Sequence, residues 1–74
     1  MAYSRLLNKF YDPANNSVVY LSNMVQCQKY LQNGGEVDFV DILYEGTKND
    51  CLVFVFRKSP LIQELYKKWQ SHEL

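Results

Sequence analysis

Residues 51–57, Cys-Leu-Val-Phe-Val-Phe-Arg, decide the fold of this chain. Aromatic and β-branched residues of this kind favour an extended strand. In such a strand, residues 52, 54 and 56 point to one side and residues 51, 53 and 55 point to the other. Both sides are apolar, which predicts a central strand that is covered on its two faces.

Two further strands are expected to flank this one. Residues 37–44 form another apolar run, and a polar loop joins it to residues 51–57, as in an antiparallel hairpin with a longer turn. Residues 17–21, Ser-Val-Val-Tyr-Leu, have the composition of a third strand. The predicted sheet therefore has three strands of antiparallel type.

A first amphipathic helix is predicted over residues 24–33. Ser22 or Asn23 fits its N-cap, and with Asn23 as the cap Gln26 occupies the capping-box position. Gly34 supplies the left-handed residue that ends the helix. Its apolar stripe consists of Met24, Cys27, Tyr30 and Leu31.

A second amphipathic helix is predicted from Pro60 to about His72. Ser59 is the expected N-cap, and Pro60 fits the first helical position because its missing N–H costs nothing there. The apolar stripe of this helix consists of Leu61, Ile62, Leu65, Tyr66 and Trp69.

The N-terminal segment leaves two structures open. Apolar residues of the segment 3–11 recur at helical spacing, but the segment is short enough to be an extended arm packed on the domain. Pro13 disfavours a helix at the residue before it, so the segment ends there. This segment could cover the second face of the sheet, and a second copy of the chain in a homodimer could also do so.

These elements predict one small α+β domain. Its order is (arm or helix)-β-α-β-β-α, with both helices on one face of the three-stranded sheet. Residues 1–16 are the N-terminal arm or short helix, and residues 17–74 are the compact domain. Met1 suggests that the chain is complete.

The overall composition excludes several classes of protein. Hydrophobic residues make up 47% of the 74 residues, which is too many for a disordered tail. Eight Lys and Arg balance eight Asp and Glu, so the chain lacks the basic excess of most electrostatic DNA binders. No apolar run is long enough for a membrane span or a signal peptide. We therefore expect a cytoplasmic protein with no membrane contact.

Residues that could catalyse a reaction or bind a metal are few and scattered. His72 is the single histidine. Cys27 and Cys51 form no CxxC pair, so two buried free thiols are expected, with a disulfide as the alternative. Gly34 and Gly35 follow a helix, whereas a phosphate-binding loop precedes one. We predict no enzyme activity, no metal and no cofactor.

Asp41 interrupts an apolar strand. We expect it to face solvent or to protect a sheet edge, and the alternative is a hydrogen bond to a helix side chain or a ligand. Asp38 and Asp41 are three residues apart, so they would point to opposite faces of an unbroken strand. This spacing argues against a paired acid–base site.

Basic and aromatic residues suggest two kinds of surface. Arg57, Lys58, Lys67 and Lys68 gather near the final helix and are the candidate nucleic-acid-binding residues, although a solvated helix flank has the same pattern. The six tyrosines exceed the needs of a small core, so some of them could mark a protein-binding patch.

A family resemblance follows from four features: the helix ending Tyr30-Leu31-x-x-Gly34, the segment 40–42, the strand 52–56, and a final helix ending near Trp69. Over residues 17–70 the chain resembles a small family of uncharacterised bacterial domains that also occurs on phages and mobile elements. The resemblance implies a compact α+β module of bacterial or phage origin and transfers no activity. It draws attention to three candidate partner-binding residues, Gln26, Tyr30 and Asp41.

Two functions remain as hypotheses. The first is a non-enzymatic protein-interaction module, such as an accessory protein of a phage or mobile element. The second is a nucleic-acid-associated protein that binds through the basic helix flank. Salt-dependent binding of DNA or RNA would favour the second hypothesis.

Overall fold

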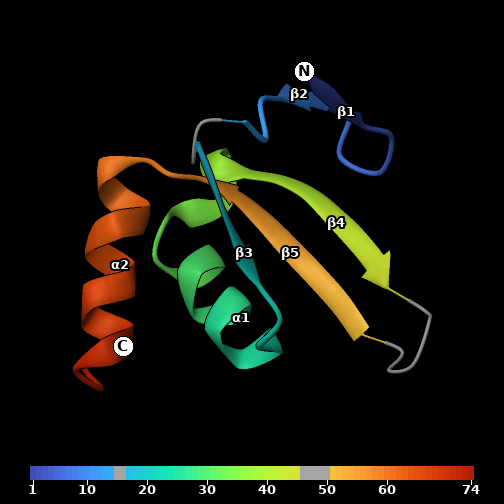
Figure 1. The fold of residues 1–74 in the computed structure, drawn as a ribbon. Helices are drawn as coiled ribbons and strands as arrows, with labels where there is room; N and C mark the ends of the chain where they lie inside the picture. Colours follow the sequence, from blue (N-terminus) through green and yellow to red (C-terminus); the bar gives the residue numbers. More distant parts are fainter. Residues whose placement is uncertain (15–16, 46–50) are drawn as a thin grey trace.

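The computed structural model describes residues 1–14, 17–45 and 51–74, and it has the predicted α+β class (Figure 1). The polar loop expected at residues 46–50 lies outside the described residues. In chain order the elements are β1 (Ala2–Ser4), β2 (Lys9–Tyr11), β3 (Val18–Leu21), α1 (Met24–Gln32), the 3-10 helix η1 (Gly35–Asp38), β4 (Phe39–Glu45), β5 (Cys51–Arg57) and α2 (Pro60–Gln70).

The main sheet has the order β3-β5-β4, with both pairs antiparallel. The strand β5 is therefore central, as its two apolar faces predict. Val19 pairs with Phe56 on one side, and Ile42 pairs with Phe54 on the other. The register shifts between Phe39 and Asp41, where β4 departs from regular pairing.

Both helices cover the same face of this sheet, as predicted (Figure 1). Asn23 caps α1 by accepting from the N–H groups of Val25 and Gln26, and Ser59 caps α2 by accepting from the N–H of Ile62. The cap of α2 is the predicted Ser59, and of the two candidates for α1 the structure selects Asn23 over Ser22. The core between the sheet and the helices consists of Leu21, Cys27, Tyr30, Phe54, Phe56, Ile62 and Leu65.

The N-terminal segment is a β-hairpin, so the helical alternative for residues 3–11 is wrong. Tyr3 and Phe10 pair across β1 and β2 with ring centroids 4.6 Å apart. Asn8 has a φ of 55°, a left-handed value that turns the chain back. A helix this short has little stability of its own, so pairing of the two strands prevails over the helical spacing.

This hairpin covers part of the second sheet face. Tyr11 is buried there together with Val18, Val40 and Val55. The sequence offered two candidates for covering this face, the N-terminal segment and a second copy of the chain. In the structure the N-terminal segment covers part of it. The rest of that face keeps Tyr20 exposed, and the partly buried Leu43 and Val53 lie beside it.

Two glycines at the end of α1 determine how the chain passes through η1 into β4. Gly34 has a φ of 89°, the left-handed conformation predicted for it. Gly35 lies so close to α1 that a Cβ atom there would be 2.7 Å from the backbone oxygen of Tyr30. This contact brings η1 against the end of α1.

Candidate functional site

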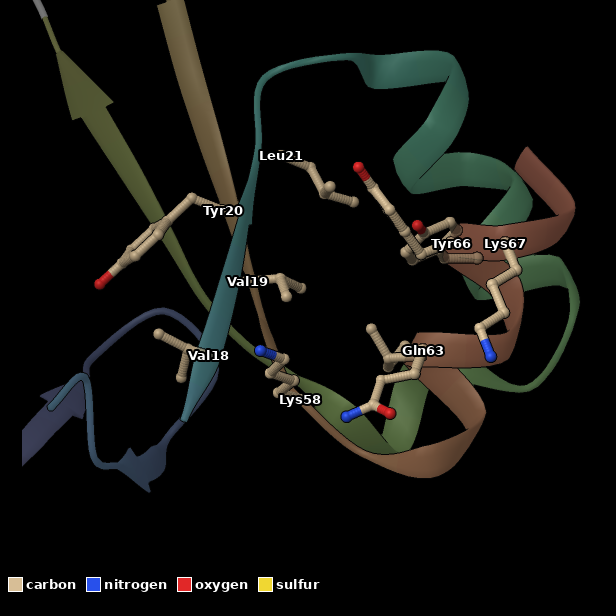
Figure 2. Close-up of a pocket in the computed structure, with 10 residues that line it drawn as sticks. Val18, Val19, Tyr20, Leu21, Lys58, Gln63, Tyr66 and Lys67 are labelled. Atoms are coloured by element: carbon tan, nitrogen blue, oxygen red, sulfur yellow. The ribbon is translucent and has the colours of Figure 1, made fainter. Parts of the chain in front are cut away.

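A groove of about 630 Å³ lies between β3 and α2 (Figure 2). We call it the β3–α2 groove. Every residue of β3 lines it, as do residues of α1, α2 and the segment that joins β5 to α2. Its lining residues are Val18, Val19, Tyr20, Leu21, Tyr30, Lys58, Ile62, Gln63, Tyr66 and Lys67.

The groove lies where α2 packs mainly on α1 and η1 and makes few contacts with β3. The buried residues of this helix, Ile62 and Leu65, join the core with Phe54 and Phe56. Tyr30 and Ile62 are almost fully buried and form the floor of the groove. Tyr66 lines the same groove but remains 50% exposed, although the sequence placed it in the apolar stripe.

The side chains of β3 alternate between the two faces of the sheet. Figure 2 shows Val19 and Leu21 pointing toward α2, whereas Tyr20 points the opposite way. Because both sets line the groove, the groove opens along the edge of β3 and not over one face alone. In the described part of the chain no strand pairs with this outer edge of β3.

Hydrogen bonding at the start of β3 shows which backbone groups face outward. The N–H of Lys58 donates to the carbonyl oxygen of Ser17 at 2.9 Å, so Ser17 faces β5. Residues of an antiparallel strand alternate between facing one neighbour and facing the other side. The N–H and C=O groups of Val18 and Tyr20 therefore point away from β5, toward the open edge.

The charge of the groove is positive. Lys58 and Lys67 line it, and none of its lining residues is acidic. Within residues 1–14, 17–45 and 51–74, neither lysine side chain forms a hydrogen bond or an ion pair. The groove thus combines an apolar floor with two available ammonium groups.

The other two predicted basic residues lie outside this groove. The guanidinium group of Arg57 donates to the carbonyl oxygens of Phe10 at 3.0 Å and Val37 at 3.4 Å. Lys68 forms an ion pair with Glu64 at 3.9 Å. The structure therefore brings Lys58 and Lys67 to one site and gives Arg57 and Lys68 other contacts.

Gln26 and Tyr30 lie together inside the core. The side-chain amide of Gln26 donates to the Tyr30 hydroxyl at 3.0 Å, so Gln26 does not complete the predicted capping box. Tyr30 is 0% exposed and packs edge-on against Phe56, with ring centroids 5.5 Å apart. Burial raises the pKa of Tyr30, and the hydrogen bond from Gln26 offsets part of that rise. Tyr30 therefore belongs to the groove floor, whereas Gln26 lies behind it in the core.

Asp41 lies on the opposite side of the sheet, under the hairpin. It is 8% exposed, and its carboxylate accepts from the Tyr11 hydroxyl at 2.6 Å and from the Ile42 N–H at 2.8 Å. The expectation of a solvent-facing Asp41 is therefore wrong, because the register shift in β4 turns both Val40 and Asp41 toward the hairpin side. The three candidate partner-binding residues do not form a common surface.

The Tyr11–Asp41 contact shifts the pKa of both groups. Burial raises the pKa of Asp41, but the hydrogen bonds from Tyr11, Ser4 and Ile42 outweigh burial and lower it below its ordinary value. Burial, the Asp41 hydrogen bond and the Asp41 charge raise the pKa of Tyr11 to about 12. The carboxylate therefore stays charged and the phenol stays protonated at neutral pH.

The remaining predicted polar residues have structural roles. Asp38 ends η1, and its carboxylate accepts from the Ser59 hydroxyl at 2.7 Å. Cys27 is a buried free thiol, and burial raises its pKa. The side chain of Cys51 lies outside the described residues.

The described residues offer neither a metal-binding cluster nor a membrane-spanning helix. Across the described ranges, no three His, Cys, Asp or Glu side chains are grouped so that they could ligate a metal ion. No described helix has the length and apolar character that crossing a bilayer requires.

Comparisons with known proteins add no family to this description. No model of a known protein family matches the chain. Neither a curated protein nor a solved structure matches it significantly. The resemblance to bacterial and phage domains therefore stays a prediction.

The sequence pointed to the two lysines of the groove but missed its apolar walls. A sheet of three strands with residues 51–57 at its centre already places residues 17–21 at an edge, so the open edge follows from the sequence. Nothing in the sequence indicates the groove between this edge and the last helix, and nothing in it singles out Gln63.

Proposed function

We propose that this protein is a non-enzymatic protein-binding module and that the β3–α2 groove is its binding surface. The observation that carries the proposal is the open edge of β3 beside an apolar floor. An unpaired strand edge offers N–H and C=O groups to another chain, and an apolar groove supplies contact area.

The two edges of the sheet support this proposal because they differ. At the β4 edge, Lys9 donates from its ammonium group to the carbonyl oxygen of Phe39 at 2.9 Å, and Asp41 is an inward-pointing charge next to a register shift. Such features are the usual protection of an edge strand against unwanted pairing. The β3 edge, Val-Val-Tyr-Leu, has no charge, no proline and no register shift.

The nucleic-acid alternative has less support. Binding of a nucleic acid backbone needs several cations along one stripe. Only Lys58 and Lys67 lie at the groove, while Arg57 contacts backbone carbonyls and Lys68 pairs with Glu64. The bacterial or phage origin, the cytoplasmic location and the homodimer remain predictions from the sequence.

A displayed library of random short peptides, selected on the full chain, tests the proposal. Peptides that bind should perturb the NMR signals of residues that line the groove. Tyr66→Ala should weaken their binding about tenfold, because a large aromatic contact is removed. Tyr44→Ala is the matched control, since Tyr44 is similarly exposed but lies on β4. Failure to select any peptide, or peptides that bind equally well to the Tyr66→Ala variant, would overturn the proposal.

A further inference from the structure

We propose that the β3–α2 groove takes an extended acidic segment of another protein, which adds to the sheet as a strand beside β3. This inference rests on the proposed function and specifies the conformation and the charge of the partner. Each of the two features follows from a separate observation.

The extended conformation follows from the backbone of β3. The outward N–H and C=O groups of Val18 and Tyr20 are spaced two residues apart, which is the repeat of a strand partner. A helix satisfies its own backbone groups and could not bond to this edge. An added strand would also continue the order β3-β5-β4 by one position.

The groove accommodates one side of such a strand. Side chains of an added strand would alternate between the two faces of the sheet. One set would lie over Val19 and Leu21, in the space between β3 and α2, with Tyr30 and Ile62 below. Apolar side chains fit this set, because the walls and floor there are apolar.

The acidic character follows from the two lysines at the groove. Lys58 is anchored beside the start of β3 through the bond of its N–H to Ser17, and Lys67 lies on α2 across the groove. None of the residues that line the groove is acidic, whereas Asp12 and Asp38 line an adjoining hollow beside Lys58. Within the groove itself, carboxylates that face Lys58 and Lys67 would have to come from the occupant.

The same charges disfavour a second copy of this chain as the occupant. Two β3 edges brought together would add the Lys58 and Lys67 of one copy to those of the other with no carboxylate lining either groove. Like charges placed across an interface oppose association. A partner of opposite charge is therefore the better complement.

Backbone pairing is tested by Tyr20→Pro, with Tyr20→Ala as its matched control. Both variants lose the tyrosine side chain, but only proline also removes the outward N–H. Proline is tolerated at edge positions whose N–H faces away from the sheet, so the fold should persist. For peptides selected from the random library, Tyr20→Pro should weaken binding about tenfold more than Tyr20→Ala does.

Charge is tested by the double variant Lys58→Glu with Lys67→Glu. Arg5→Glu with Lys68→Glu is the control, because it makes the same change in net charge outside the groove. The selected peptides should be rich in Asp and Glu. Their binding should fall about tenfold or more in the groove variant, and much less in the control.

A measurement on the unchanged protein makes the test independent of any variant's folding. When a selected peptide binds, hydrogen exchange at the amides of Val18 and Tyr20 should slow about tenfold or more, because these N–H groups become bonded. Unchanged exchange at both amides, with the peptide bound in the groove, would overturn strand addition.

The other outcomes separate this inference from the function on which it rests. Peptides that need Tyr66 but are neutral or basic would overturn the acidic partner and leave the groove as a binding surface. An oligonucleotide that competes with every selected peptide and loses affinity in the groove variant would replace the protein partner with a nucleic acid. If no peptide binds the groove, both proposals fail together.

Discussion

Replacing Tyr11 with phenylalanine should loosen the N-terminal hairpin from the sheet. The change removes the hydroxyl that donates to the Asp41 carboxylate at 2.6 Å and leaves the ring in place. Asp41 is 8% exposed, so little water can replace the lost donor. The Ile42 N–H and Ser4 remain as its partners. A hydrogen bond to a charged group contributes about 1.5–3 kcal/mol, so we expect unfolding to become easier by about 2 kcal/mol.

Urea denaturation at neutral pH, followed by circular dichroism, measures this free energy. For a domain of this size, a loss of about 2 kcal/mol corresponds to a fall in Tm of about 10 °C. Tyr3→Phe is the control, because Tyr3 lies on the same hairpin with its hydroxyl bonded to Asn8 at the surface. Equal stability of the Tyr11→Phe variant and the unchanged protein would refute the reasoning that Asp41 depends on this donor.

The same pair predicts loss of stability at both extremes of pH. The pKa of Asp41 is lowered in the folded protein, so its contribution is present above its ordinary pKa of 3.8 and is lost as pH falls through the folded value. The pKa of Tyr11 is raised from 10.0 to about 12, so its contribution is present below pH 10 and is lost as pH rises toward 12. The Tyr11→Phe variant should lose less stability than the unchanged protein between pH 10 and 12. The variant should still lose some stability at alkaline pH, because burial also raises the pKa of Tyr30.

Three further substitutions test other parts of the structure. Gln26→Ala should cost about 1–2 kcal/mol of unfolding free energy, because the buried Tyr30 hydroxyl loses its donor. Peptide binding should stay within about twofold. A stable variant that no longer binds would instead assign Gln26 to the binding surface. Gly35→Ala should cost about 1–3 kcal/mol, since the added Cβ would be 2.7 Å from the Tyr30 backbone oxygen, and an unchanged Tm would contradict this crowding. A homodimer of the predicted kind would bury the uncovered part of the second sheet face. In such a dimer, Leu43→Asp should reduce the mass measured by light scattering from that of two chains to that of one, and a dimer that persists in this variant must use another surface.

Local patterns predicted the sheet and the helices well, because each of these signals lies within a few residues. Residues 51–57 identified the central strand through two apolar faces, and Asn23 and Ser59 marked the starts of the helices through their capping side chains. The hairpin was harder, because its spacing also fits one face of a helix and its pairing depends on a left-handed Asn8.

The polar contacts between distant segments could not be predicted. Tyr11 and Asp41 are thirty residues apart in sequence, and they meet only because of the register shift in β4. The edge position of β3 follows from the central position of β5 in a three-stranded sheet. The groove also needs α2 to pack against α1, and no local pattern in either helix indicates this contact. The lysines were found because charge is visible in a sequence, whereas the shape around them is not.

The short length of β3 explains how its edge can stay open and still discriminate between partner segments. Its outward groups are the N–H and C=O of Val18 and Tyr20, which give four backbone hydrogen bonds at most. At about 0.5–1.5 kcal/mol each, these bonds contribute about 2–6 kcal/mol. Association costs about 4–15 kcal/mol, so backbone pairing offsets at best the lower end of this cost and leaves no surplus for tight binding. A strand without apolar side chains for the groove and carboxylates for Lys58 and Lys67 would therefore dissociate. The floor around Tyr30 is already packed in the free protein, so little of the binding energy is spent on ordering the site.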